Sequence, residues 1–224
     1  MLEILSTISS NKKVFIGIPL GIVFFSNIAI TQIKGLAFIG ELAVIGGFCN
    51  LAAILIGLRT DIQILSDSEN NAQDNLNKGI SAMLTLIIIS FPLIFLGYFF
   101  GVNIEYILIG FLATSIALNE ITSSFLLRAS RYHFYTFLRS LPSILILLIV
   151  LHVESPIKSW IICYAAMLIV LTFILIKEFK KAGVSLNVSF KPAIIYIKDK
   201  ILPTLTALLC ATGSVFWLFI VSEK

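Results

Sequence analysis

The chain has 224 residues, of which 58% are hydrophobic and only 12% are charged, and its formal net charge is +4. A soluble domain carries about twice that charged fraction, because its surface has to be solvated. The composition therefore excludes an ordinary water-soluble domain.

Seven apolar stretches are long enough to cross a bilayer, which takes about 20 helical residues. Their continuous hydrophobicity, as in "LTLIIISFPLIFLGYFF", lacks the alternation that is typical of transmembrane barrel strands. We therefore expect an all-α integral membrane protein. The spans are predicted at 14–33, 36–58, 79–100, 104–126, 137–153, 157–176 and 201–221.

The basic residues divide unequally between the two sides that these spans define. Thirteen of the sixteen lysines and arginines fall on the side of the N-terminus. Because Lys and Arg collect in cytoplasmic loops, we predict a multi-pass protein of the cytoplasmic (inner or plasma) membrane with its N-terminus in the cytoplasm. The positive charge is expected to face membrane lipids, with no nucleic acid as partner.

The chain has two longer inner loops and is predicted to consist of three parts. Ser66-x-x-Glu69 is a capping-box pattern for a helix that leads into the third span. Pro192 suits the first turn of a helix that continues past Pro203. The parts are a six-helix transmembrane lobe (1–176), a basic cytoplasmic connector (177–200) and a seventh transmembrane helix (201–224).

The second span carries a stripe of small residues within an arc of about 80°. Such a stripe lets another helix approach closely, and Asn50 is expected to hydrogen-bond across it. Glu41 lies about 180° from Asn50 on the same helix, so the two cannot share one site on it. The stripe consists of Ala43, Gly46, Asn50, Ala53 and Gly57.

The fourth span repeats this design with charges on its small-residue face. We expect that face to look into the bundle or into a wet cavity, because ionisable groups avoid lipid. Two interpretations of Glu120 stay open: a carboxylate paired inside the packing, or a functional cavity residue. The arc of about 80° holds Gly110, Ala113, Ala117, Glu120, Ser124, Arg128 and Arg131.

The stretch "GLRTDIQIL" places Arg59 and Asp61 at the end of the second span. We expect both at the cytoplasmic rim, beside Arg128 and Arg131, as an inner gate or a head-group contact. Position alone also explains Arg59 as a topology marker. No arginine or lysine is expected deep within a span.

Signals for enzyme chemistry are missing from the sequence. It contains no HExxH, no GxSxG, no aspartate-rich motif, and no acid and histidine on one helical face. His133 and His152 have no second ligand at metal-binding spacing. We expect no enzyme, no cofactor and no metal site.

Several stretches together are typical of one family. They are "QIKGLAFIGELAVIGG", "GLRTDIQIL", "SDSENNAQD", "FLLRASRYHFYTFLRSLPSILILL" and "PTLTALL". The chain resembles the N-terminal half of polysaccharide flippases, the O-antigen (lipopolysaccharide) and capsule exporters of the multidrug/oligosaccharidyl-lipid/polysaccharide exporter superfamily. Leu58-Arg59-Thr60-Asp61 and Arg131-Tyr132 match motifs of that family, with Thr60 in place of an aromatic residue.

The resemblance implies flipping of a polyprenyl-pyrophosphate-linked oligosaccharide by alternating access between two six-helix lobes. In relatives, basic residues of the central cavity contact the pyrophosphate. A half or truncated transporter of this kind needs a second lobe, by homodimerisation or from another chain. The alternative is a non-transporting membrane scaffold or relic that associates with polysaccharide assembly proteins.

Overall fold

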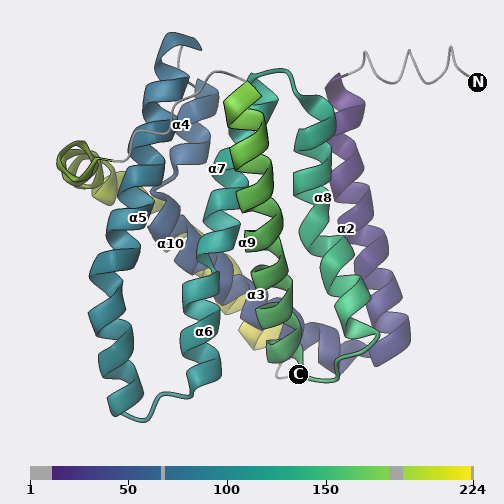
Figure 1. Cartoon of the computed structure of the whole chain (residues 1–224). Helices are drawn as coiled ribbons and strands as arrows, with labels where there is room; N and C mark the ends of the chain where they lie inside the picture. The colour runs from purple at the N-terminus through teal and green to yellow at the C-terminus, as the bar shows by residue number, and fades with distance from the viewer. Residues whose placement is uncertain (1–11, 67–68, 182–188, 223–224) are drawn as a thin grey trace, which may run out of the picture.

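The computed structural model describes residues 12–66, 69–181 and 189–222, and within these ranges every regular element is a helix (Figure 1). In chain order the helices are α2 (Lys12–Lys34), α3 (Leu36–Gly57), α4 (Thr60–Ser66), α5 (Glu69–Phe99), α6 (Ile104–Leu112), α7 (Thr114–Arg128), α8 (Tyr132–Val150), α9 (Pro156–Lys181) and α10 (Phe190–Ser222).

Among the described residues, five helical stretches are long and apolar enough to cross a membrane, which confirms the prediction of an all-α, multi-pass membrane protein. They match the predicted first, second, fourth, fifth and sixth spans. The predicted spans 79–100 and 201–221 stay predictions as membrane crossings, although α5 and α10 run through them. The five are Val14–Lys34, Leu36–Gly57, Ile107–Arg128, Tyr132–Val150 and Pro156–Leu175.

The helices form a bundle in which α3 runs obliquely (Figure 1). Helix α2 packs along α8, and α9 packs against α8, α7, α6 and α3. Helices α6 and α7 lie in line and meet at Ala113, whose backbone stays right-handed (φ −58°, ψ −20°). The predicted fourth span is therefore one interrupted helix.

Small residues of α3 let its neighbours approach, as the predicted stripe requires. Gly46, Ala53 and Gly57 are buried. A Cβ atom on Gly46 would lie 3.0 Å from the Trp160 ring of α9, and one on Gly57 would lie 3.3 Å from Ala117 Cβ of α7. Both glycines therefore mark points of close helix packing.

A sharp kink separates α3 from α4. Leu58 (φ 50°) and Arg59 (φ 53°) are consecutive non-glycine residues in the left-handed region, which costs about 1–2 kcal/mol per residue. The Leu58 N–H donates to the Ile54 carbonyl at 3.1 Å, and the Leu58 side chain is only 1% exposed. Burial and this hydrogen bond offset the backbone strain.

Helix α10 packs on α3 and α5, and its first turns hold the kink in place. Tyr196 donates to Gln63 Oε1 at 2.9 Å, and its hydroxyl lies 3.1 Å from Thr60 Oγ1. Leu58 and Tyr196 also belong to one buried apolar cluster. The kink is thus fixed by a helix that begins about 130 residues later in the chain.

Helical structure extends into both ends of the predicted connector 177–200. Helix α9 continues to Lys181 and α10 already begins at Phe190, while 182–188 lie outside the described residues. The predicted capping box also includes 67–68, outside the described ranges, so it stays a prediction, although α5 does begin at Glu69.

Candidate functional site

A cavity of about 500 Å³ lies between α2, α3, α7, α8 and α9. This size falls within the range of about 300–1,000 Å³ that is common for small-molecule sites. Leu20, Val23 and Ile39 are among its apolar residues. Its polar lining consists of Asn27, Asn50, Asn119, Glu120, Arg139 and Ser143.

An ion pair between two of the candidate spans forms part of the cavity wall. Arg139 Nη1 of α8 donates to Glu120 Oε1 of α7 at 3.3 Å. The two side chains are 40% and 39% exposed. The Glu120 carboxylate is thus paired with an arginine and also lines the cavity, so both structural features considered from the sequence are present.

Arg139 was missed as a candidate, and the expectation of no arginine deep within a span is wrong. The predicted fifth span began at 137, which put Arg139 at its edge. Helix α8 begins at Tyr132, so Arg139 stands about 10 Å along it. The sequence does contain a pattern that indicates the position of Arg139. Four residues share one face of the helix, and all of them line the cavity: Arg139, Pro142, Ser143 and Ile146.

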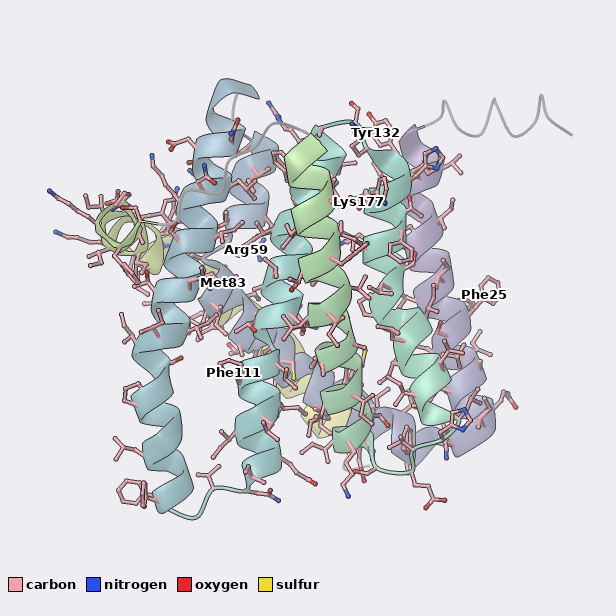
Figure 2. All side chains as sticks on the ribbon, in the orientation of Figure 1. Phe25, Arg59, Met83, Phe111, Tyr132 and Lys177 are labelled. Atoms are coloured by element: carbon pink, nitrogen blue, oxygen red, sulfur yellow. The ribbon has the colours of Figure 1, made fainter. Side chains whose placement is uncertain are left out.

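Arg59 and Asp61 follow directly after the candidate span Leu36–Gly57, and their place at the cytoplasmic rim stays a prediction. Gly57 packs on Ala117, which stands eleven residues, or about 16 Å, before the end of α7. Arg59, two residues after Gly57, lies further from the upper end of the bundle than Tyr132 and Lys177 (Figure 2). Both Arg59 and Asp61 interact electrostatically with Glu120.

Arg59 is constrained by its position in the kink. Its Nε atom is buried and has no hydrogen-bond partner among the residues that the structure describes. Together with Asp61, Glu120 and Arg139 it forms a set of four charges, which we call the charge cluster. The cluster has no net charge, because it contains two arginines and two acids.

Arg128 is the last residue of α7, and Arg131 follows in the connection to α8. Arg128 Nη1 donates to the Leu65 carbonyl at 3.0 Å and so ties the end of α7 to α4. Ser130 turns left-handed (φ 59°), and the Arg131 N–H donates to the Leu126 carbonyl at 2.8 Å. The helix therefore ends before Arg131, which leaves the predicted common face, whereas Glu120 and Arg128 both lie within α7.

Only one of the two polar candidate residues of α3 lines the cavity. Asn50 lies on the cavity wall. Glu41 is exposed and is not among the cavity-lining residues, as their opposite positions on the helix require. Of these two residues, only Asn50 can contact a molecule in the cavity.

Asn119 is a further cavity residue that the sequence analysis missed. Its side chain is 4% exposed, and Nδ2 donates to the Leu138 carbonyl at 3.2 Å. Oδ1 has no hydrogen-bond partner within the described part of the chain. A buried acceptor without a partner costs about 1–3 kcal/mol, so a donor from a bound molecule would stabilise it.

Trp160 gives the cavity a fixed aromatic wall. Its Nε1 donates to the Leu42 carbonyl at 2.8 Å, and its ring stacks on Tyr164 with centroids 4.9 Å apart. Both rings line the cavity. Within the described ranges no group of three His, Cys, Asp or Glu side chains is placed to hold a metal ion. The lining thus offers hydrogen-bonding groups, an ion pair and an aromatic surface.

No protein-family model, curated protein or solved structure matches the chain. The resemblance to polysaccharide flippases therefore stays a prediction.

Proposed function

We propose that the protein binds the head group of a lipid-linked oligosaccharide in this cavity and takes part in moving it across the cytoplasmic membrane for surface-polysaccharide synthesis. The observation that carries the proposal is the Glu120–Arg139 pair on a cavity wall between membrane helices. A charge at the centre of a span costs about 2.5–3.5 kcal/mol, so such residues are by default functional.

The mixed lining of the cavity supports an amphipathic substrate. Asn50, Asn119 and the ion pair supply polar contacts, whereas Leu20 and Val23 of α2 supply an apolar surface. A lipid-linked sugar has both characters in one molecule. The stretches that resemble polysaccharide flippases favour an oligosaccharide on a polyprenyl pyrophosphate over other lipids.

We also propose the larger assembly that such transport requires. The chain acts as one lobe, made of six spans and a seventh helix, with its N-terminus in the cytoplasm. The second lobe is either another copy or another chain, because alternating access needs two units that move against each other.

Reconstitution into liposomes tests this proposal. A fluorescent oligosaccharide on polyprenyl pyrophosphate is placed in the vesicles, and its transfer between leaflets is followed with a quencher that cannot cross the membrane. We expect transfer to fall about tenfold or more in Arg139→Ala, since one charge-assisted hydrogen bond contributes about 1.5–3 kcal/mol. Arg131→Ala, an exposed arginine outside the cavity, is the matched control.

Equal transfer in protein-containing and empty liposomes would contradict the proposal. Chemical crosslinking of the same samples shows whether a second copy is present. Absence of transfer in a sample that contains crosslinked dimers would favour the non-transporting scaffold.

A further inference from the structure

We infer that the cavity recognises an uncharged sugar ring and discriminates against an anionic phosphate group. This inference rests on the proposed function, because it concerns what the same cavity binds. Three independent features of the lining carry it: its charge balance, its unpaired acceptor and its aromatic wall.

The charge balance of the lining disfavours an anion. Among the lining residues only Glu120 and Arg139 carry opposite full charges, and they are paired. Arg59 and Asp61, which also act electrostatically on Glu120, are likewise of opposite sign. A phosphate group would have to compete with Glu120 for Arg139 and would meet repulsion from the carboxylate.

The hydrogen-bonding groups of the lining suit hydroxyls. Asn119 Oδ1 is a buried acceptor that lacks a partner in the described structure, so it favours a ligand that donates a hydrogen bond. A sugar hydroxyl donates, whereas a fully ionised phosphate only accepts. Asn50 and the Glu120–Arg139 pair add donors and acceptors on two further helices.

The aromatic wall suits the apolar face of a sugar ring. Trp160 is half-buried, and its hydrogen bond to Leu42 together with stacking on Tyr164 fixes its plane. A rigid amphipathic aromatic side chain gives contact area at low entropic cost. Because Trp160 lines the cavity, we expect its fluorescence to report on binding.

A single-tryptophan variant makes this measurement specific. The chain has two tryptophans, so Trp217→Phe leaves Trp160 alone. The purified full chain, in an amine-oxide detergent without sugar, is titrated with octyl glucoside and separately with octyl phosphate. We expect a saturable change of emission with octyl glucoside. Octyl phosphate should bind about tenfold more weakly, which corresponds to the loss of one good polar contact.

Two substitutions in this background test the residues. Asn119→Leu should weaken octyl glucoside binding about tenfold, whereas Gln32→Leu, which replaces an exposed amide of α2 outside the cavity, should leave it unchanged. Glu120→Gln leaves Arg139 without its counter-charge, so the preference should shift toward octyl phosphate. A merely structural role of Glu120 would weaken both ligands equally.

Binding of octyl phosphate as tight as that of octyl glucoside would overturn the inference, as would an unchanged affinity in Asn119→Leu. Its failure is distinguishable from failure of the proposed function. Selective glucoside binding without transfer in liposomes would leave the sugar site standing and remove transport. Transfer in liposomes combined with a preference for octyl phosphate would support transport and overturn the sugar site.

Discussion

Glu120 and Arg139 neutralise each other at a depth where either charge alone would be unfavourable. The pair also joins α7 to α8, and both side chains remain about 40% exposed to the cavity. Exposure of this extent weakens the contribution of the pair to stability. Its position on the cavity wall points to binding rather than to stability as its main role.

A charge reversal separates these two roles. Arg139→Glu places two carboxylates side by side, so we expect the free energy of unfolding to fall by about 1–2 kcal/mol after allowance for solvent screening. The double variant Glu120→Arg with Arg139→Glu should recover most of this loss. Thermal unfolding in detergent measures both, and equal stability of the single and double variants would contradict direct pairing.

Sequence reasoning located some cavity residues and missed others for physical reasons. Helical periodicity singled out Asn50 and Glu120, both of which line the cavity, because each lies well within one helix, α3 or α7. It did not predict the kink at Arg59, since nothing in the residue types of Leu58 and Arg59 signals two left-handed backbones. It missed Arg139 because hydropathy locates the apolar part of a span, while α8 begins in the polar segment before it.

At the scale of elements, the α3–α4 kink depends on close contact with α5. A Cβ atom on Gly79 would collide with the Thr60 side chain, and it would lie 3.0 Å from Thr60 Cβ itself. Thr60 is fully buried beneath Tyr196, so it has little room to move. Glycine at position 79 is therefore required by the packing of α5 on the kink.

This contact gives a prediction with a matched control. Gly79→Ala should destabilise the protein by about 1–3 kcal/mol, the usual cost of overpacking. Gly110→Ala changes a helical glycine that has nothing within 4 Å, so the gain in helix propensity should leave it neutral or slightly more stable. Thermal midpoints of the two variants compare the effects. Similar midpoints would show that the Thr60 side chain can move to accommodate the added methyl group.

The helices themselves were largely predictable. Apolar runs of about 20 residues have few alternatives to a helix in lipid, so the second span agreed to within one residue at its end. The interruption at Ala113 and the packing of α10 on α3 were not predictable. Both depend on contacts between residues distant in sequence, which periodicity does not contain.

For the whole molecule, the positions of the helix ends are relevant to its orientation in the membrane. Helices α7 and α9 both end, and α8 begins, at the upper end of the bundle in Figure 1, where Lys177 and Tyr132 lie in Figure 2. Arg128 and Arg131 belong to the same α7–α8 connection. This arrangement is what the predicted cytoplasmic side requires.

Cysteine labelling of intact cells tests that orientation. In a background without the three native cysteines, Arg131→Cys and Lys177→Cys should react with an impermeant maleimide only after lysis. Lys158→Cys, which lies near the start of α9, should react in intact cells. The opposite labelling pattern would invert the proposed topology.

The contact between Tyr196 and the kink has a consequence for biogenesis. Thr60 and Gln63 find their hydroxyl partner 136 and 133 residues later in the chain. During synthesis both side chains therefore lack their Tyr196 partner until α10 has been translated and docks. Because contacts of such long range form slowly, attachment of α10 should be a late step of folding. Until then, the Thr60 and Gln63 side chains would be accessible to quality-control proteases.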